Sequence, residues 1–322
     1  MEAALDITFH RSQWPASRRA ALNACICRRR MDARFHYESP EQIAAWLEVH
    51  ESHSPARSDP AVSRLYADAV AASDAGGHRP ACLASVGCGY GHKDLDSLRA
   101  IGAGAYAAID AGQGMVAQAM ARIKAALPGI IVRGLVADVA NAEGMAAWLR
   151  AVFPAQESVL WLAYGIVPNI PAPEIPAVLR ALVQSRRDRI LVGANLIPGQ
   201  DPPAEMAAIL PQYDNPATRR WLAILPQSLG IPIRPDDIHY EVLPPVHGHP
   251  WRIRAGAAIK DACVIAPSEE PMAIRAGENF ELFFSNRFTP GDIDTIAKTA
   301  AMHVGRSHIA PARNEGVFEI RL

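Results

Sequence analysis

Apolar runs and amphipathic segments alternate between residues 80 and 200. Short apolar, β-rich runs predict buried strands at 81–86, 105–110, 130–139, 158–165 and 189–197. Apolar positions between them recur with helical spacing and predict helices at about 93–100, 114–126, 142–152 and 175–184. Strands and helices that alternate in this way form a mostly parallel sheet with helices on both faces. We therefore expect an α/β fold.

The alternation stops where prolines become frequent, between residues 198 and 285. This region predicts helical turns at about 204–210 and 218–225, and strands near 238–243, 251–254 and 261–265. The α/β pattern then resumes with a helix from Pro290 to Met302, capped by Thr289, and strands at 304–309 and 316–322. Near the N-terminus, amphipathic helices are expected at 40–50, capped by Ser39, and at 63–72. We predict a core domain of residues 58–199 and 286–322, and a second domain of residues 1–57 and 200–285.

Composition narrows the possible partners and compartments. The chain has 322 residues and a formal net charge of −1, so nucleic acid and anionic membrane surfaces are not expected as partners. No apolar run reaches membrane-spanning length, and the N-terminus lacks a secretory pattern. An odd count of five cysteines favours a reducing cytoplasm. The oligomeric state is left open.

A metal site is not expected. Cys25 and Cys27 have no second cysteine pair downstream. His239, His247 and His249 lack a cysteine or carboxylate at matching spacing, so we interpret them as solvated loop residues.

Glycines follow the first predicted strand of the core. Gly87, Gly89 and Gly91 lie between that strand and a helix that begins near Lys93. Glycines at such a turn allow tight bending and let main-chain N–H groups approach a ligand. The turn therefore predicts a nucleotide-type cofactor at this edge of the sheet.

Acidic residues follow the next two predicted strands. Asp110 ends the second strand and can accept hydrogen bonds from both hydroxyls of a ribose. Asp138 ends the third, where its carboxylate can accept from an exocyclic amine and the N–H of Val139 can donate to a ring nitrogen. Tyr164 ends the fourth strand at the same edge. These residues, with the glycines, predict an adenosine-containing cofactor.

The end of the chain favours S-adenosylmethionine over NAD as that cofactor. The turn reads G-C-G-Y-G and lacks the G-x-G-x-x-G spacing of dinucleotide-binding folds. The closing helix and two strands suit the seven-stranded sheet of class I (Rossmann-like) methyltransferases, in which the last strand inserts antiparallel. A nicotinamide-dependent oxidoreductase is the less favoured alternative.

Several motifs resemble the histidine-specific Nα-methyltransferases of ergothioneine biosynthesis, and together they span nearly the whole chain. They are Phe35-His-Tyr37, Ser54-Pro-Ala-Arg57, Gly87-Cys-Gly-Tyr-Gly-His-Lys93, Tyr164-Gly-Ile-Val-Pro-Asn169, Gln212-Tyr-Asp-Asn-Pro216 and Phe283-Phe-Ser-Asn-Arg-Phe288. The resemblance implies a methyltransferase core and a second, substrate-binding domain. It implies that Gly87, Lys93, Asp110, Asp138 and Val139 bind S-adenosylmethionine, and that Asn169 and Tyr213 hold the amino and carboxylate groups of an amino acid.

The chain departs from the family at positions that face the substrate. Phe283 stands where the family has a glutamate that pairs with imidazole, although Ser285 is kept. A phenyl ring cannot accept the imidazole N–H, so an acceptor other than histidine is expected. His53-Ser54 replaces a tyrosine pair, and Pro168 replaces a glycine. Glu281 is an alternative partner for the substrate.

The sequence thus predicts an S-adenosylmethionine-dependent methyltransferase that modifies a nitrogen of a small, amino acid-like metabolite in a biosynthetic pathway. His53, Asn169, Tyr213, Phe283 and Ser285 are the predicted substrate-binding residues. Tyr37, His53 and Tyr213 are candidates for orienting or deprotonating the nucleophile, and no general base is assigned. Methylation of oxygen, carbon or sulfur on the same fold, and a non-catalytic binding protein, remain alternatives.

Overall fold

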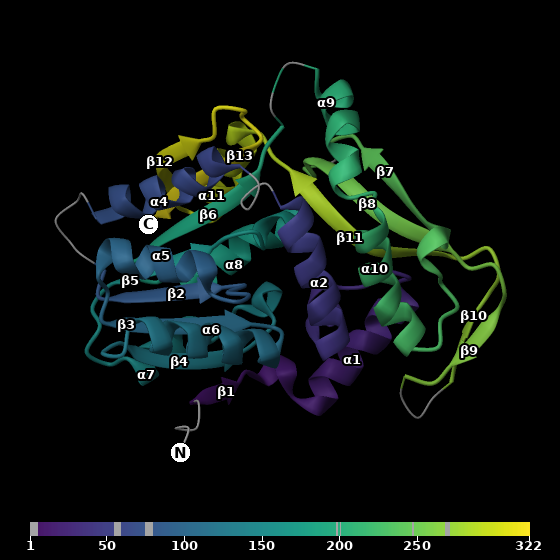
Figure 1. Ribbon diagram of the computed structural model, residues 1–322, viewed down its shortest axis with the longest axis horizontal. Helices are drawn as coiled ribbons and strands as arrows, with labels where there is room; N and C mark the ends of the chain where they lie inside the picture. The colour runs from purple at the N-terminus through teal and green to yellow at the C-terminus, as the bar shows by residue number, and fades with distance from the viewer. Residues whose placement is uncertain are drawn as a thin grey trace.

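An eight-stranded sheet forms the centre of the protein (Figure 1). The computed structural model describes residues 6–54, 59–74, 80–197, 199, 201–246, 248–267 and 271–322. Across the sheet, the strands are β1 (Ile7–Phe9), β4 (Ile131–Val136), β3 (Ala105–Asp110), β2 (Cys82–Val86), β5 (Val159–Ala163), β6 (Arg189–Asn195), β13 (Glu315–Arg321) and β12 (His303–Ile309). β13 pairs antiparallel with both β6 and β12, and the other strand pairs of this sheet are parallel. The predicted α/β sheet with an antiparallel last strand is confirmed.

The expectation of seven strands was wrong, because the N-terminal segment adds an eighth. Residues 7–9 pair in parallel with residues 134–136 at the edge of β4. This pairing satisfies main-chain groups that an open edge would leave to water. A strand of three residues is too short to show an alternating pattern in the sequence. β1 lies within the segment assigned to the second domain, and the domain boundaries themselves remain a prediction.

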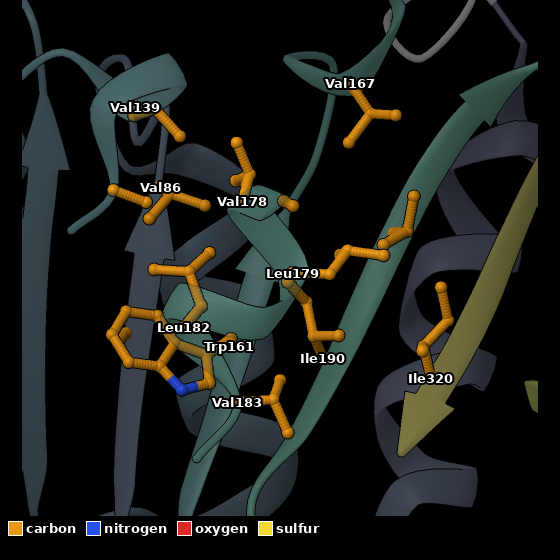
Figure 2. Packing of buried hydrophobic residues seen from close by; sticks show 14 of the residues in the cluster. Val86, Val139, Trp161, Val167, Val178, Leu179, Leu182, Val183, Ile190 and Ile320 are labelled. Carbon is orange, nitrogen blue, oxygen red and sulfur yellow. The ribbon is translucent and has the colours of Figure 1, made fainter. Parts of the chain in front are cut away.

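Helices cover both faces of this sheet. On one face lie α4 (Pro60–Asp74), α5 (His92–Ile101) and α6 (Gln113–Ala126). On the other lie α7 (Met145–Val152), α8 (Ile175–Leu182) and α11 (Pro290–Thr299), and Figure 2 shows Trp161 of β5 beside Leu182 of α8 there. Every residue of β2, β3 and β5 is buried, so the loops after these strands start from rigid positions. None of the helices in the described ranges has the length and apolar character needed to cross a membrane.

A smaller antiparallel sheet lies beside the central one. Its strands are β7 (Ile238–Leu243), β8 (Trp251–Ala258) and β11 (Asn279–Arg287), and a hairpin of β9 (Cys263–Ile265) and β10 (Met272–Ile274) extends from it. The helices α1 (Pro15–Cys27), α2 (Pro40–His53), α9 (Pro202–Ile209) and α10 (Pro216–Ser228) surround it, and Figure 1 shows α2 between the two sheets. β11 was not predicted as a strand, because a bulge at Leu282 interrupts its alternation.

The two predicted helix caps are present. The Ser39 hydroxyl accepts a hydrogen bond from the N–H of Gln42, and the Gln42 side-chain oxygen accepts one from the N–H of Ser39. Gln42 also donates to the carbonyl of Phe35 at 2.9 Å, which ties the 3₁₀ turn Ala33–Tyr37 to α2. Thr289 and Asp292 form the same arrangement at α11.

A buried carboxylate links β5, β6 and α7. Asp188 is 1% exposed, and its two oxygens accept from Arg150 at 2.6 and 2.7 Å. The N–H of Val159, the first residue of β5, donates to the same carboxylate at 3.1 Å. Asp188 therefore fixes the starts of two strands whose ends carry residues of the site.

We expect Asp188→Ala to lower the free energy of unfolding by about 2–3 kcal/mol, because it leaves Arg150 and a buried N–H without their partner. Glu157→Ala removes the exposed ion pair with Arg187 and is expected to cost less than about 1 kcal/mol. Urea denaturation followed by circular dichroism measures both. Equal losses in the two variants would contradict this account.

Candidate active site

A cavity of about 930 Å³ opens at the carboxyl ends of the parallel strands and extends toward the smaller sheet. Every predicted cofactor-binding residue lines it: Gly87, Gly89, Gly91, Lys93, Asp110, Asp138, Val139 and Tyr164. So do His53, Asn169, Tyr213 and Phe283 of the predicted substrate-binding set, together with Tyr37. Ser285 does not line it. Residues 55–57 of the predicted N-terminal motif, and His247, lie outside the described residues.

The glycine turn between β2 and α5 is fixed by main-chain geometry. Gly87, Gly89 and Gly91 have φ values of +72°, +51° and +68°, which side chains rarely adopt. A Cβ at Gly87 would also lie 3.2 Å from the side chain of Ile166. The N–H groups of Gly87 and Cys88 donate to the carbonyl of Ile109 at 2.8 and 3.1 Å. The turn is thus held against the end of β3 with its main chain along the cavity.

Asp110 is held by the main chain at the end of β3. Its carboxylate accepts from the N–H groups of Gly89 and Gly112, each at 3.0 Å. Burial raises the pKa of this carboxyl, and the two main-chain donors oppose the rise. The side chain therefore has a set orientation and retains lone pairs for donors in the cavity.

Asp138 is positioned by the N-terminal segment. Its carboxylate pairs with Arg34 at 2.8 Å and accepts from the N–H of Ala140 at 3.1 Å, while its own N–H donates to Ser12 at 3.0 Å. Burial raises the pKa of Asp138, and the charge of Arg34 opposes the rise. Sequence reasoning missed Arg34 and Ser12, because their contacts span more than a hundred residues and leave no local pattern.

Lys93 lies among aromatic rings at the base of the cavity. Its ammonium lies 3.8 Å from the ring centre of Tyr66 and 5.8 Å from that of Tyr164. Tyr66 donates to Glu315. The Tyr164 hydroxyl is buried and has no hydrogen-bond partner among the described residues. Tyr66 and Glu315 were not predicted, since α4 and the start of β13 meet the cavity only in the folded chain.

Aromatic rings form the wall of the cavity on the side of the smaller sheet. Tyr37 lies 5.7 Å from Trp221, Trp221 lies 5.9 Å from Phe283, and Phe283 lies 6.2 Å from Tyr213, all between ring centres. Trp46 of α2 extends this series, 5.8 Å from Tyr37. We call these five residues the aromatic wall. It offers an apolar surface and π faces to whatever enters this half of the cavity.

The bulge in β11 determines which residues face Tyr213. Leu282 has no partner on β8, and its carbonyl instead accepts from the buried His36 at 2.8 Å. Beyond the bulge, the two-residue period of a strand places Phe283, Ser285 and Arg287 toward Tyr213. His36 thereby supports the strand that presents these residues.

A polar network lies behind the aromatic wall. Tyr213 donates to the Ser285 hydroxyl at 3.0 Å, and the Asn195 amide donates to the same hydroxyl at 3.1 Å. Arg287 donates to the Tyr213 hydroxyl at 2.8 Å. Ser285 is 1% exposed and acts in this structure through Tyr213 and Asn195. Asn195 ends β6, so the strand-end rule that selected Asp110 could have found it.

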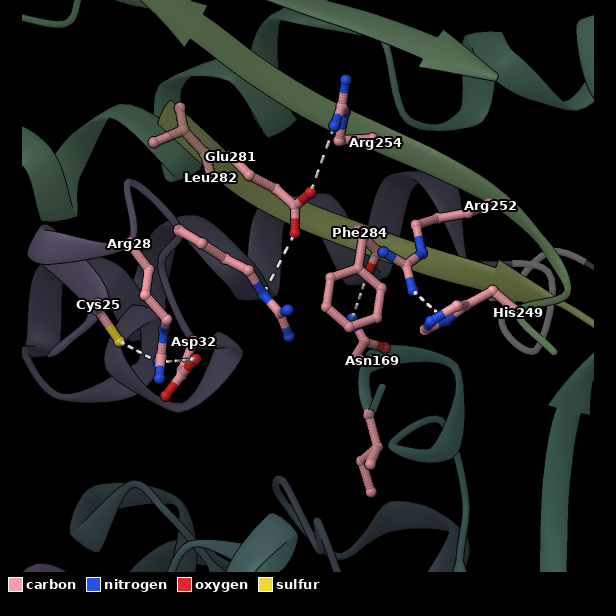
Figure 3. Close-up of polar contacts among 12 residues, drawn as sticks. Cys25, Arg28, Asp32, Asn169, His249, Arg252, Arg254, Glu281, Leu282 and Phe284 are labelled. Atoms are coloured by element: carbon pink, nitrogen blue, oxygen red, sulfur yellow. Dashed lines mark hydrogen bonds and ion pairs between the residues drawn. The ribbon is translucent and has the colours of Figure 1, made fainter. Parts of the chain in front are cut away.

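Glu281 and Asn169 lie on opposite sides of Phe284 (Figure 3). Glu281 forms ion pairs with Arg30 at 3.4 Å and Arg254 at 3.8 Å and does not line the cavity. Asn169 donates to the carbonyl of Phe284 at 3.3 Å while it lines the cavity. Glu281, the acidic residue nearest to Phe283 in β11, is thus paired with two arginines outside the cavity.

The sequence model for histidine-specific, S-adenosylmethionine-dependent methyltransferases matches residues 50–321. The chain belongs to this family. It is an S-adenosylmethionine-dependent methyltransferase, and S-adenosylmethionine is its cofactor. The predicted family and cofactor are thereby confirmed, and NAD is excluded as the cofactor.

Solved methyltransferase structures also match. One is an S-adenosylmethionine-dependent methyltransferase from Clostridium acetobutylicum ATCC 824, with a TM-score of 0.47, 10% identity and coverage of 87% of this chain and 98% of that one. Another is magnesium protoporphyrin IX methyltransferase from Synechocystis PCC 6803 with bound SAH, with a TM-score of 0.47, 14% identity and coverage of 89% and 96%. No curated protein matches the chain.

We expect Asp110→Asn to weaken S-adenosylhomocysteine binding about 10- to 100-fold, the value of a charge-assisted hydrogen bond. The amide removes one acceptor oxygen and the negative charge from this position. Isothermal titration calorimetry measures the affinity. Asp294→Asn, on the outer surface of α11, is the control and is expected to bind like the wild type. Unchanged affinity in Asp110→Asn would show that this carboxylate does not contact the cofactor.

We expect His36 to make the free energy of unfolding depend on pH below about neutrality. Burial lowers the pKa of His36 from 6.5 to about 4, so the unfolded chain takes up a proton at a higher pH than the folded protein. Its contribution is complete above pH 6.5 and is lost as the pH falls toward 4. His36→Gln keeps a donor for Leu282 without this titration. In urea unfolding at about pH 7.5, 6 and 5, its free energy of unfolding should therefore decline less steeply with falling pH than that of the wild type.

The exposed His303→Gln variant is the control and should follow the wild type. Parallel declines for the wild type and His36→Gln would show that His36 is not responsible.

Proposed function

We propose that this methyltransferase modifies a nitrogen of a small, amino acid-like metabolite that has an apolar or aromatic side chain, and that it does not act on histidine. One observation carries the proposal: Phe283 lies in the cavity between Trp221 and Tyr213. Its position is that of the imidazole-binding glutamate in the family that the chain resembles. Because Glu281 is held by Arg30 and Arg254, no neighbouring carboxylate of β11 replaces it.

The sheet-side half of the cavity fits S-adenosylmethionine. The glycine turn has no side chains at three positions and lets a ligand approach its main chain closely, and Asp110 would bind the ribose hydroxyls. Asp138 and the N–H of Val139 would hold the adenine, and Lys93 the carboxylate. The unpartnered Tyr164 hydroxyl supports a polar ligand at this end. When bound, the cofactor supplies a methyl group that is already activated as a sulfonium, so the protein needs mainly to align the acceptor and exclude water.

The other half of the cavity fits the acceptor. The aromatic wall would pack against an apolar or aromatic side chain and exclude water from it. Asn169 and Tyr213 line this half and would bind the amino and carboxylate groups, with His53 at the end of α2 as a further contact. Ser285 would support Tyr213 from behind.

The acceptor amine must lose its proton before it reacts. Burial and the charge of Asp110 raise the pKa of Tyr37 well above its ordinary value, so Tyr37 stays protonated at neutral pH and can orient the amine but cannot deprotonate it. Removal from bulk water in the cavity disfavours an ammonium ion and therefore lowers the pKa of the bound amine, which promotes loss of its proton before reaction. No general base is required by this account.

We expect the wild type to methylate an aromatic or aliphatic amino acid and to turn over histidine at least about 100-fold less efficiently, because the imidazole N–H would be left unpaired. Phe283→Glu supplies an acceptor and should raise turnover of histidine about tenfold or more while lowering that of the apolar acceptor. Release of S-adenosylhomocysteine and product mass, measured over a panel of amino acids and amines, test this.

Phe283→Leu is the matched variant, which keeps an apolar surface and should not gain histidine. Product fragmentation distinguishes N- from O-, C- or S-methylation. Efficient methylation of histidine by the wild type would refute the argument from Phe283, and cofactor binding without any turnover would favour a binding protein.

A further inference from the structure

We propose that Arg287, next to Tyr213, forms the ion pair with the carboxylate of the methyl acceptor. This rests on the proposed function, since it places a carboxylate-bearing acceptor in the half of the cavity next to the aromatic wall. It adds a specificity residue at the end of β11 that no motif assigned to substrate.

Arg287 is a buried cation without a matching anion. It is 4% exposed and lines the cavity. Among the described residues, no carboxylate oxygen lies within the 4.0 Å of an ion pair with it, and its Nε is buried without a hydrogen-bond partner. Within the described ranges, the guanidinium donates one hydrogen bond, to the Tyr213 hydroxyl at 2.8 Å. A buried guanidinium with most of its donors unused is costly unless a ligand supplies the missing acceptor.

The chemistry of the guanidinium selects the ligand. Arginine presents its N–H donors as a planar fork, which matches the two oxygens of a carboxylate. The charge of Arg287 lowers the pKa of the Glu315 carboxyl, but Lys93 does so as well, and Glu315 also accepts a hydrogen bond from Tyr66. Burial raises the pKa of Glu315, although Lys93 and Arg287 oppose the rise. Glu315 is therefore shared and does not form an ion pair with Arg287.

Main-chain bonds hold Arg287 in place at the joint between the two sheets. The N–H of Phe288 donates to the carbonyl of Asn195 at 2.9 Å, and the N–H of Ile197 donates to the carbonyl of Phe288 at 3.0 Å. The guanidinium also lies 5.5 Å from the ring centre of Tyr213. A guanidinium fixed at both ends of its side chain can orient a bound carboxylate with little further loss of entropy.

Its neighbours assign Arg287 to the acceptor rather than to the cofactor. Arg287 contacts Tyr213, which contacts Phe283 of the aromatic wall. Lys93 is the second residue of α5, which begins directly after the glycine turn, and its ammonium lies against Tyr66. The two cations thus serve two different carboxylates.

Protein saturated with S-adenosylhomocysteine is titrated with 3-phenylpropanoate and with 3-phenylpropanamide, and tryptophan fluorescence reports binding because Trp46 and Trp221 line the cavity. These probes carry an apolar group and lack the reacting amine. We expect the wild type to bind the acid at least about 30-fold more tightly than the amide, and Arg287→Met to lose this preference. Arg254→Gln, on the neighbouring strand and outside the cavity, is the control and should keep it.

Arg287→Lys keeps the charge without the fork and is expected to give an intermediate preference. It also serves if Arg287→Met does not fold. S-adenosylhomocysteine affinity should stay within about threefold of the wild type in both variants. The proposal is overturned if Arg287→Met and Arg287→Lys both keep the wild-type preference for the acid. It is also overturned if the variants keep that preference but bind S-adenosylhomocysteine about tenfold more weakly.

Activity separates this proposal from the proposed function. If Arg287 governs binding of the acid but no amino acid is N-methylated, the anion site stands and the proposed function fails. If an amino acid is N-methylated and its methyl ester reacts equally well in the wild type and Arg287→Met, the anion site fails and the proposed function stands.

Discussion

The main-chain contacts of the glycine turn after β2 fix the half of the cavity that lies over the central sheet. Two N–H groups of the turn, from Gly87 and Cys88, share the carbonyl of Ile109, and a third, from Gly89, donates to Asp110. The neighbouring strand thus holds the turn, and the turn in return orients the carboxylate. This mutual constraint works only where glycine permits positive φ and close packing, as Gly87 does beside Ile166.

The parallel sheet positions the other residues of the site at the same edge as the glycine turn. Asp110, Asp138 and Asn195 are far apart in the chain, but Asp110 and Asn195 each end a strand of the sheet and Asp138 lies two residues beyond the end of β4. Adjacent strands lie only about 4.8 Å apart, so their ends converge on one edge. The bonds between Phe288 and residues 195 and 197 then attach the end of β11 to the same edge. These bonds fix the position of the smaller sheet relative to the half of the cavity over the central sheet.

The two halves of the cavity present different physical surfaces. The half over the central sheet offers the glycine turn, two carboxylates and Lys93, which suit a polar and charged molecule. The other half offers the aromatic wall with one buried guanidinium at its end. Such a surface favours binding of a molecule that is apolar along its length and carries a negative charge at one end. The bulge at Leu282, held by His36, places Phe283 within that surface.

The local sequence was sufficient for the strands of the central sheet, the caps at Ser39 and Thr289, and the strand-end residues, because periodicity, capping and strand-end position are properties of a few consecutive residues. The family and its cofactor also followed from motifs, since the glycine turn and its acidic partners have fixed spacing. The eighth strand, β1, was not predicted, because three residues are too few to show the alternating pattern of a strand.

Only the tertiary structure brought Arg34 to Asp138, Tyr66 to Lys93 and Arg287 to Tyr213. It also moved Ser285 behind the cavity wall and left Glu281 between two arginines. Whether a buried charge meets a partner depends on chain segments that can be more than two hundred residues apart, and no local pattern encodes those distances. The sequence by itself therefore determined the class of fold and its cofactor, whereas the folded chain decided which side chains face the acceptor.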